Sequence, residues 1–334
     1  MITIAVDCMG GDYAPDEIVK GALWGAAEHR VKVLLIGQPS RIEALVAESP
    51  YRHVDYEVVE ATEVIDMGET PASSIRKKKD ASINVATRCV GEGRAQGVVA
   101  AGNTGAAMAS AIFNMGRVKG IDRPAIAVHL PTVSRPFLVV DAGANADCLP
   151  EMLLQFARMG SIFYSAIHGV DNPRVGLLNI GEEPGKGNTF SVSGYKLLEE
   201  YDEINFVGNV EARHMYEQHA EVAVCDGFTG NIFLKTSEAV ALLMLRMMKD
   251  AVNSGIRARA GGLLVKSALK STIVKKVVDE ETGGAILLGV KGLCVIAHGN
   301  SKAYAILNAL GLAKQAIEQN VVEQMETKVL EGCM

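Results

Sequence analysis

The chain has 334 residues, of which 49% are hydrophobic and 22% charged, so it can bury a large core as one big α/β domain or as one domain with a subdomain. Its net charge of −6 argues against general nucleic-acid binding, which needs a basic surface to neutralise phosphates. The six cysteines form no CxxC pair, so they indicate neither a zinc site nor a disulfide framework, and a reducing cytoplasm fits. The first apolar run begins at residue 2 without a charged leader, and no run reaches the roughly 18 apolar residues of a membrane span. We therefore expect neither a standard export signal nor a transmembrane segment.

Short apolar runs recur along the chain, and each ends in a Gly- or Asn-containing loop that often leads into a helical pattern. Examples are "VKVLLIG", "QGVVAAGNTG", "PFLVVDAGAN", "VGLLNIG" and "EVAVCDGFTGN". Continuous apolar strands are typical of a parallel sheet that helices cover on both faces. The pattern predicts a doubly wound α/β fold, in which ligands bind beyond the carboxyl ends of the strands. Several of these loops should therefore converge on one cleft.

The loop after the first strand, "DCMGGDYAP", supplies Asp7, Gly10 and Gly11. These residues are candidates for substrate binding because they follow a strand end. Ordinary turn chemistry is the alternative, since Gly and Asp serve tight turns.

A basic cluster follows in "SSIRKKKDAS", which contains Arg76, Lys77, Lys78 and Lys79. Such a cluster can dock an acidic partner, and it can equally be the solvated face of a helix.

In "VVAAGNTGAAMASAIF" a strand runs into Gly102, Asn103, Thr104 and Gly105 and then into an alanine-rich helix. The unpaired backbone N–H groups at such a helix start can hold an anion, and Asn103 and Thr104 add side-chain partners. An ordinary strand-to-helix turn with a Thr cap is the alternative.

The next loop of this kind, "DAGANAD", supplies Asp141 and Asn145. We treat both as candidates for substrate binding, with turn formation as the alternative.

The stretch "GLLNIGEEPGKGN" places Lys186 between two glycines. A P-loop needs four residues before its Gly-Lys and a Ser or Thr after it, whereas here three residues precede and Gly187 follows. Two carboxylates, Glu182 and Glu183, would also repel a triphosphate. Lys186 is therefore a candidate ligand for something other than a nucleotide.

"CDGFTGNIFLKTSEA" repeats the arrangement of a loop before a helix, with Asp226, Gly230 and Asn231. Two such loops in one sheet favour a phosphate or acyl-phosphate site. There is no GxGxxG, so a dinucleotide site has little support.

Residues 251–278 carry six basic residues and no acid, and they predict a helical excursion within 240–282. Leu269, Ile273 and Val277 recur at four-residue spacing beside Lys266 and Lys270, as an amphipathic helix at a membrane surface requires. A pair of helices at a dimer interface is the alternative.

Near the end, "VIAHGNS" places His298 after a strand, where it can donate to an oxyanion or bond the backbone. Cys8 and Cys225 adjoin loops of interest, but neither has a neighbouring histidine in sequence to activate it. We expect no acyl-enzyme on either.

Taken together, "DCMGGDYAP", "SSIRKKKDAS", "AAGNTGA", "DAGAN", "GLLNIGEEPGKGN", "DGFTGN" and "AHGNS" resemble the phosphate acyltransferase family of bacterial phospholipid synthesis, from residue 2 to about residue 310. The resemblance implies one domain over residues 1–334, a Rossmann-like three-layer α/β/α sandwich similar to phosphotransacetylases and isocitrate dehydrogenases, and a homodimer. It also implies transfer of a fatty acyl group from acyl carrier protein to inorganic phosphate.

On this basis Lys186 is the expected cation, and Asn231, Asn103 and Thr104 are expected to donate hydrogen bonds to phosphate or to the tetrahedral intermediate. No metal and no organic cofactor is required. We expect a cytoplasmic protein that contacts an anionic membrane surface and works beside a membrane glycerol-phosphate acyltransferase. The alternatives are a CoA-dependent phosphate acetyltransferase and a non-catalytic scaffold at the membrane surface.

Overall fold

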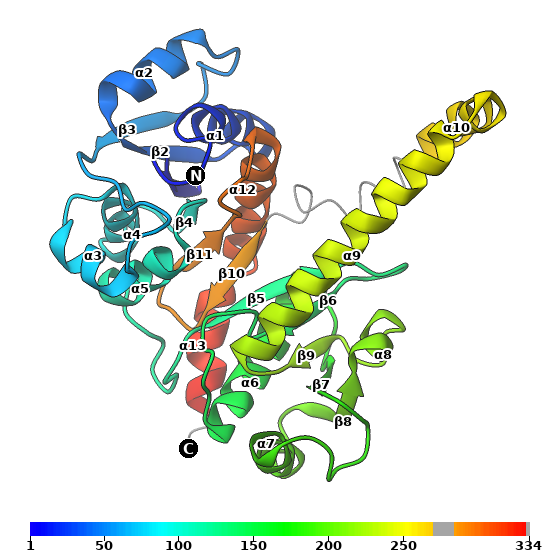
Figure 1. The fold of residues 1–334 in the computed structure, drawn as a ribbon. Coiled ribbons are helices and arrows are strands. Elements are labelled where there is room, and N and C mark those ends of the chain that lie inside the picture. Colours follow the sequence, from blue (N-terminus) through cyan, green and yellow to red (C-terminus); the bar gives the residue numbers. More distant parts are fainter. Residues whose placement is uncertain (270–283, 332–334) are drawn as a thin grey trace.

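The computed structural model of the chain describes residues 1–269 and 284–331, whose strands form one eleven-stranded sheet. The strand order is β3-β2-β1-β4-β11-β10-β5-β6-β9-β7-β8 (Figure 1). The strands are β1 (Thr3–Asp7), β2 (Lys32–Gly37), β3 (Tyr56–Glu60), β4 (Gly97–Ala100), β5 (Ala125–Leu130), β6 (Phe137–Val140), β7 (Arg174–Asn179), β8 (Asn205–Glu211), β9 (Val222–Val224), β10 (Ala285–Leu288) and β11 (Leu293–Ile296).

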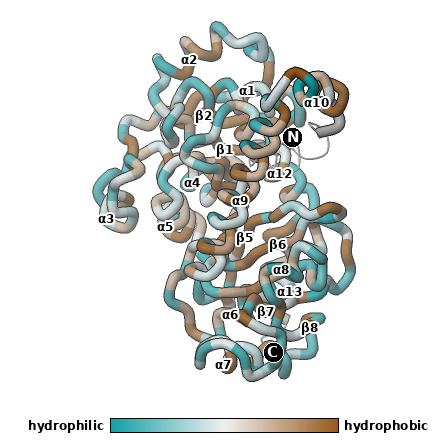
Figure 2. Tube along the Cα trace, turned by 45° about the vertical axis from the view of Figure 1, so that its right-hand side comes forward, coloured by the Kyte–Doolittle hydropathy of each residue, from teal (hydrophilic) through white to brown (hydrophobic). Residues whose placement is uncertain are grey.

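Helices cover both faces of this sheet and enclose two apolar cores, one on each side. Figure 2 shows the hydrophobic colour concentrated along the central strands that these helices cover. The helices are α1 (Asp16–His29), α2 (Pro39–Glu48), α3 (Pro71–Lys77), α4 (Ser82–Gly91), α5 (Thr104–Asn114), α6 (Pro150–His168), α7 (Thr189–Glu199), α8 (Ala212–Tyr216), α9 (Gly227–Asn253), α10 (Ile256–Leu269), α12 (Ala303–Glu318) and α13 (Val321–Glu331).

The predicted α/β sandwich with a mostly parallel sheet is confirmed, and the sheet has an additional feature in its middle. Within the described strands, three pairings are antiparallel: β11 with β10, β10 with β5, and β5 with β6. These pairings divide the sheet into two parallel blocks that run in opposite directions. Short apolar runs did not reveal this reversal, because a buried antiparallel strand looks the same in sequence as a parallel one.

The register explains how loops from both blocks reach one place. Residues that pair with each other on neighbouring strands form a row across the sheet. This row consists of Val99, Val295, Ile286, Ala127, Val140 and Val224. Strands β4 and β11 each end one residue beyond this row, and β6 and β9 end on it. The strands of the two blocks run in opposite directions, and their carboxyl ends meet at the same height on the two sides of β5. In a fully parallel sheet the carboxyl ends would instead all lie along one edge.

Helices α9 and α10 form an arm that projects from the body of the protein (Figure 1). The excursion predicted for 240–282 begins inside α9, and its extent stays a prediction. Residues Lys270, Ile273, Lys275, Lys276 and Val277 of the predicted surface helix lie outside the described residues. Among those that are described, no helix is long and apolar enough to cross a membrane.

Candidate active site

A cleft of about 420 Å³ opens where the carboxyl ends of the two blocks meet. Its floor is β5, through Ile126, Val128 and Leu130. Loops from both blocks form its walls, and they contribute Thr104, Gly143, Asn231 and His298. The predicted convergence of several strand-end loops on one cleft thus agrees with the structure.

The start of α5 forms one wall and carries the strongest anion-binding geometry. The Asn103 side chain caps the helix by accepting from the Ala106 N–H at 3.0 Å. Its amide also donates to the backbone carbonyls of residues 66, 67 and 69, at 3.1–3.3 Å. The side chain of Asn103 is therefore engaged on both ends. The N–H groups of Thr104 and Gly105 precede the first helical hydrogen bond, and they have no protein acceptor within the described chain.

The start of α9 forms the opposite wall and is closed by its own polar groups. Asp226 accepts from the N–H and the hydroxyl of Thr229, both at 2.8 Å. The Gly227 N–H donates to the Asn145 carbonyl at 2.8 Å. A side chain at Gly230 would collide with the carbonyl of Asp141, so glycine lets this turn pack closely on the neighbouring loop. The packing places the exposed side chain of Asn231 in the cleft.

Asp141 holds the loop between β6 and α6 and is fully buried. Its carboxylate accepts backbone N–H bonds from Ile126, Gly143, Ala144 and Asn145 at 2.7–3.0 Å, and a side-chain bond from Asn145 at 2.9 Å. Burial raises the pKa of Asp141, and these donors oppose that effect because they stabilise the ionised form. Asp141 and Asn145 thus shape the cleft wall through Gly143, and they are not among the residues that line the cleft.

The second turn of α9 adds charged residues that the sequence analysis did not select. The Lys235 ammonium lies 3.2 Å from Glu238, and the other oxygen of Glu238 lies 3.6 Å from His298 Nε2. These contacts join α9 of one block to the loop after β11 of the other. Helical periodicity could have found these residues, since they follow Asn231 at positions i+4 and i+7.

His129 of β5 also lines the cleft. Its Nε2 lies 2.9 Å from Nε2 of His168 on α6, and its ring packs against Phe163 and Tyr164. Burial, and to a smaller extent the neighbouring His168, lowers the pKa of His129 to about 3. The imidazole is therefore neutral at pH 7, so it contributes no positive charge to the cleft.

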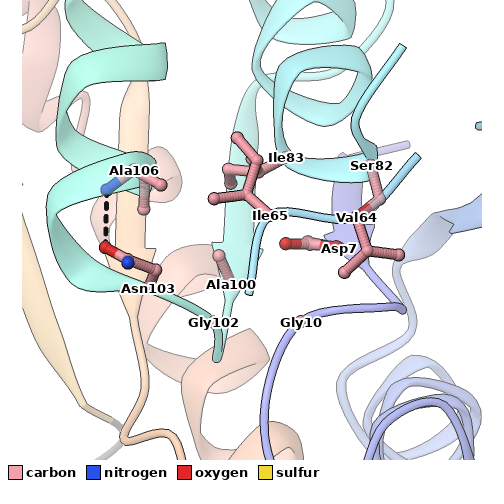
Figure 3. Close-up of a pocket in the computed structure, with 11 residues that line it drawn as sticks. Asp7, Gly10, Val64, Ile65, Ser82, Ile83, Ala100, Gly102, Asn103 and Ala106 are labelled. Carbon is pink, nitrogen blue, oxygen red and sulfur yellow. Dashed lines mark hydrogen bonds between the residues drawn. The ribbon is translucent and has the colours of Figure 1, made fainter. Parts of the chain in front are cut away.

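Asp7 and Gly10 line a second, narrower pocket of about 10 Å³, together with Gly102 and Asn103. Figure 3 shows Asp7 beside Ser82 and Val64 in this pocket. A Cβ on Gly10 would lie 3.0 Å from the Cα of Gly102, so these glycines let two loops approach closely. The volume is about that of a single water molecule and is too small for phosphate. Burial raises the pKa of Asp7.

Gly11 lies nearby at a φ of +106°, and the following N–H, of Asp12, donates to the Gly299 carbonyl at 2.7 Å. Gly11 therefore ties the first loop to the loop that carries His298.

Lys186 lies in the loop after β7, outside the residues that line the cleft. Its side chain is 51% exposed and lies 3.9 Å from Glu183. Asn179 and Asn209 hold the loop by donating to the carbonyls of Lys186 and Glu183 at 3.1 and 2.8 Å. Because β7 is parallel to β9 and adjacent to it, this loop follows the same sheet edge as the start of α9.

The basic cluster at α3 divides into two kinds of residue. Lys78 lies 2.5 Å from Glu69 and donates to the Val64 carbonyl at 2.7 Å, so it holds the loop before α3. The hydrogen bond from Lys78 lowers the pKa of Glu69 to about 2. Arg76, Lys77 and Lys79 are exposed and available to a partner.

The cysteines near the cleft are not thiolates at neutral pH. Cys225 and Cys8 are buried, and burial raises both thiol pKa values well above their ordinary range. Burial also raises the pKa of Cys148, to about 11. None of the three is poised as a nucleophile.

The chain is similar in sequence to a known protein family and in fold to solved structures. A family model described as "Fatty acid synthesis protein" matches residues 2–324. A protein named phosphate acyltransferase from Heliobacterium modesticaldum is 49% identical over 327 residues, which cover 98% of this chain and 97% of the relative. One of the same name from Trichodesmium erythraeum is 46% identical over 330 residues, covering 98% and 96%. A solved phosphotransacetylase from Streptococcus pyogenes superposes with a TM-score of 0.60 at 16% identity, covering 95% of this chain and 94% of that one, which confirms the expected fold.

Proposed function

The chain belongs to the phosphate acyltransferase family, and we propose that it transfers a fatty acyl group from acyl carrier protein to inorganic phosphate. The acyl phosphate formed would then serve phospholipid synthesis. One observation carries this proposal: Thr104, whose backbone N–H has no protein acceptor among the described residues, lines a cleft that Asn231 and Lys235 also line. This combination of helix start, amide and ammonium suits a dianion.

The proposed reaction is direct phosphorolysis of a thioester. A phosphate oxygen attacks the carbonyl carbon and forms a C–O bond, and the tetrahedral intermediate collapses as the C–S bond breaks. The leaving sulfur takes up the proton that hydrogen phosphate loses as the acyl phosphate forms. The raised thiol pKa values of Cys8 and Cys225 support attack by phosphate without an acyl-enzyme.

Each residue at the cleft has a proposed role in this reaction. Thr104 and the start of α5 hold the phosphate, because helix N-termini carry partial positive charge. Asn231 donates to the phosphate or to the developing oxyanion, and His298 is a second possible donor, held by Glu238 at 3.6 Å. Asn103, Asp141, Asn145 and Asp226 act indirectly by fixing the two walls.

Lys186 is the proposed cation that stabilises negative charge in the transition state. The loop that carries it is three strand spacings from β5, or roughly 14 Å at the usual inter-strand distance. Its exposure and its single weak ion pair leave the ammonium available to a ligand. The proposal therefore requires the loop to close on bound substrate, as flexible loops do in many enzymes.

The acyl donor distinguishes this proposal from a CoA-dependent phosphate acetyltransferase. The purified protein is assayed for phosphate-dependent release of free thiol from palmitoyl-acyl carrier protein and from acetyl-CoA. We expect the carrier-protein thioester to be preferred. A preference for acetyl-CoA would favour the alternative, and absence of thioester cleavage with either donor would contradict an enzymatic role and favour the scaffold.

Acyl carrier protein is an acidic partner, and the exposed Arg76, Lys77 and Lys79 are the proposed docking residues. Matched substitution of these three residues by Glu should raise KM for the carrier-protein thioester and leave kcat nearly unchanged.

The arm is the proposed contact with a second copy of the chain and with an anionic membrane surface, in a cytoplasmic protein that acts beside a membrane glycerol-phosphate acyltransferase. Exposed apolar side chains on both helices support this proposal, among them Leu243, Met247, Leu263 and Leu264. Replacing Lys266, Lys270, Lys275 and Lys276 by Glu should abolish sedimentation with anionic vesicles and leave the dimer and the soluble activity intact. Unchanged vesicle binding would contradict the membrane contact.

A further inference from the structure

Three metal-ligating side chains meet on the surface where the loop after β7 lies beside α8 and the turn that follows α8, outside the residues that line the cleft. They are Glu182, His214 and His219, and one ligand atom from each lies within 4.8 Å of the other two. We propose that these residues form a binding site for a divalent transition-metal ion. This inference does not depend on the proposed acyltransferase reaction.

The local fold brings the two histidines together although four residues separate them in sequence. Helix α8 ends after Tyr216, and Gln218 adopts a left-handed conformation with a φ of +64°. The turn is closed by the His219 N–H, which donates to the His214 carbonyl at 3.1 Å. The two imidazole rings consequently stack, with centroids 4.6 Å apart and planes inclined by 16°.

This turn is anchored to the body of the protein. The Gln218 side-chain amide donates to the Thr132 hydroxyl at 2.9 Å and to the Arg135 carbonyl at 2.6 Å. The Gln218 carbonyl accepts from the Arg174 guanidinium at 2.8 Å. The backbone positions of the two histidines are therefore set before any ligand binds, which reduces the conformational entropy that binding would cost.

The contact between His214 and Glu182 is close but is not a well-formed hydrogen bond. Nδ1 of His214 is buried and makes no hydrogen bond of acceptable geometry, although Glu182 Oε1 lies 2.5 Å away. A buried polar atom without a hydrogen bond costs free energy and calls for an explanation. A metal ion between the nitrogen and the carboxylate would satisfy both atoms.

Two side-chain movements are needed to admit the ion. Glu182 must move away from His214 Nδ1, and the exposed His219 ring must rotate out of the stack, because a bound ion lies in the plane of each imidazole and the two planes are nearly parallel. Two ligand atoms at the Zn–N and Zn–O distances of a tetrahedral site are separated by roughly 3.3 Å. The Glu182 side chain is 53% exposed, so it can rotate outward by the required amount. The better-buried His214 can keep its position.

The donor set determines the class of ion. Two imidazoles and one carboxylate suit zinc and the neighbouring first-row ions, whereas calcium and magnesium prefer oxygen donors alone. Three protein ligands leave a further position for water. Glu217 lies 3.6 Å from His219 Nε2 and adds negative charge beside the site, which also favours a cation.

Metal binding would have a structural consequence for the loop that contains Lys186. Asn209 and Asn179 already hold this loop through the carbonyls of Glu183 and Lys186. An ion on Glu182 would attach the same loop to α8 at a further point. The site would therefore limit the movement of the loop.

The test uses the full-length protein after removal of metals and a titration with Zn²⁺ against a chromophoric chelator. His219→Gln and Glu182→Gln remove exposed ligands with little risk to folding. His53→Gln, at an exposed histidine elsewhere, is the matched control. We expect one Zn²⁺ per chain, binding at least about tenfold weaker in either ligand variant, and unchanged affinity in the control.

A second readout is the melting temperature, which a bound ion raises by mass action. Zn²⁺ should raise it in the wild-type protein and in His53→Gln, and should fail to raise it in His219→Gln. Equal Zn²⁺ affinity in all four proteins would contradict the proposal, because binding would then reside on other groups such as thiols. Absence of stoichiometric binding in the wild type would contradict it as well.

Discussion

The starts of α5 and α9 face each other across the cleft, and their sequences are alike but their hydrogen bonding differs. At α5 the cap uses the Asn103 side chain, and the N–H groups of Thr104 and Gly105 lack a protein acceptor in the described structure. At α9 the Asp226 side chain caps the helix in the same way by accepting from the Thr229 N–H, but the first N–H, of Gly227, donates to the Asn145 carbonyl. A glycine- and threonine-rich loop before a helix can thus bind an anion, or it can be a packing joint, meaning a turn whose N–H groups bond to the neighbouring loop. The neighbouring loops determine which of the two it becomes.

The backbone groups of the two helix starts carry only partial charge, and the Lys235 ammonium in the cleft is paired with Glu238, so the largest effect is expected at Lys186. Lys186→Ala should lower kcat/KM by at least about 10²–10³-fold, the usual cost of losing one oxyanion donor, without lowering the melting temperature. Lys196→Ala, an exposed lysine on the next helix, is the control and should leave activity unchanged. A fall of less than tenfold in Lys186→Ala would remove this residue from the mechanism and leave the two helix starts to act without it.

Substituting Asn103 at the start of α5 and Asn231 at the start of α9 should have different effects. Asn231→Ala should lower kcat by about 10²–10³-fold with unchanged stability, because its side chain is exposed in the cleft. Asn103→Ala should instead destabilise the protein by about 1–2 kcal/mol, because it removes a helix cap. Urea unfolding and initial rates separate the two effects. The opposite pattern, with stability lost at Asn231 and preserved at Asn103, would break the comparison.

The packing joint at α9 depends on the buried carboxylate of Asp141. Asp141→Asn should lower the free energy of unfolding by about 3 kcal/mol, because an amide group would face N–H donors and leave some of them unsatisfied. Asp147→Asn, at an exposed carboxylate on the same loop, should change it by less than about 0.5 kcal/mol. Similar unfolding midpoints for the two variants would mean that Asp141 does not hold the joint.

His129, on the strand that forms the floor of the cleft, should make the free energy of unfolding depend on pH. Its pKa is about 3 in the folded chain and about 6.5 when unfolded, so the unfolded state binds more protons between these values. This stabilisation is present above pH 6.5 and is lost as the pH falls. From pH 7.5 to pH 5.5 the loss due to His129 should be about 1.4 kcal/mol.

The lowered pKa of His168 acts in the same direction. Urea unfolding at the two pH values checks both, with a His129→Leu, His168→Leu double variant expected to lose less stability than the wild type. His53→Gln should behave as the wild type. An equal loss in the double variant would assign the pH dependence to other groups.

The sequence predicted the strand-end loops and the residues in them, because apolar runs followed by Gly, Asn and Asp are local signals. It did not reveal that Asp141, Asn145 and Asp226 bond within the protein, since the partners of Asp141 and Asn145 include Ile126 and Pro124 of another segment. The reversal of strand direction at β10 and β5 was also hidden, because pairing register depends on long-range contacts. Lys235 and Glu238 were accessible in principle, from the period of α9 after Asn231.

The central claim is that the cleft between the starts of α5 and α9 binds the reacting phosphate. A crystal structure of the protein soaked with inorganic phosphate tests it most directly. The account predicts phosphate within hydrogen-bond distance of the Thr104 N–H and of the Asn231 amide. Phosphate bound elsewhere in the protein, with this cleft vacant, would contradict it.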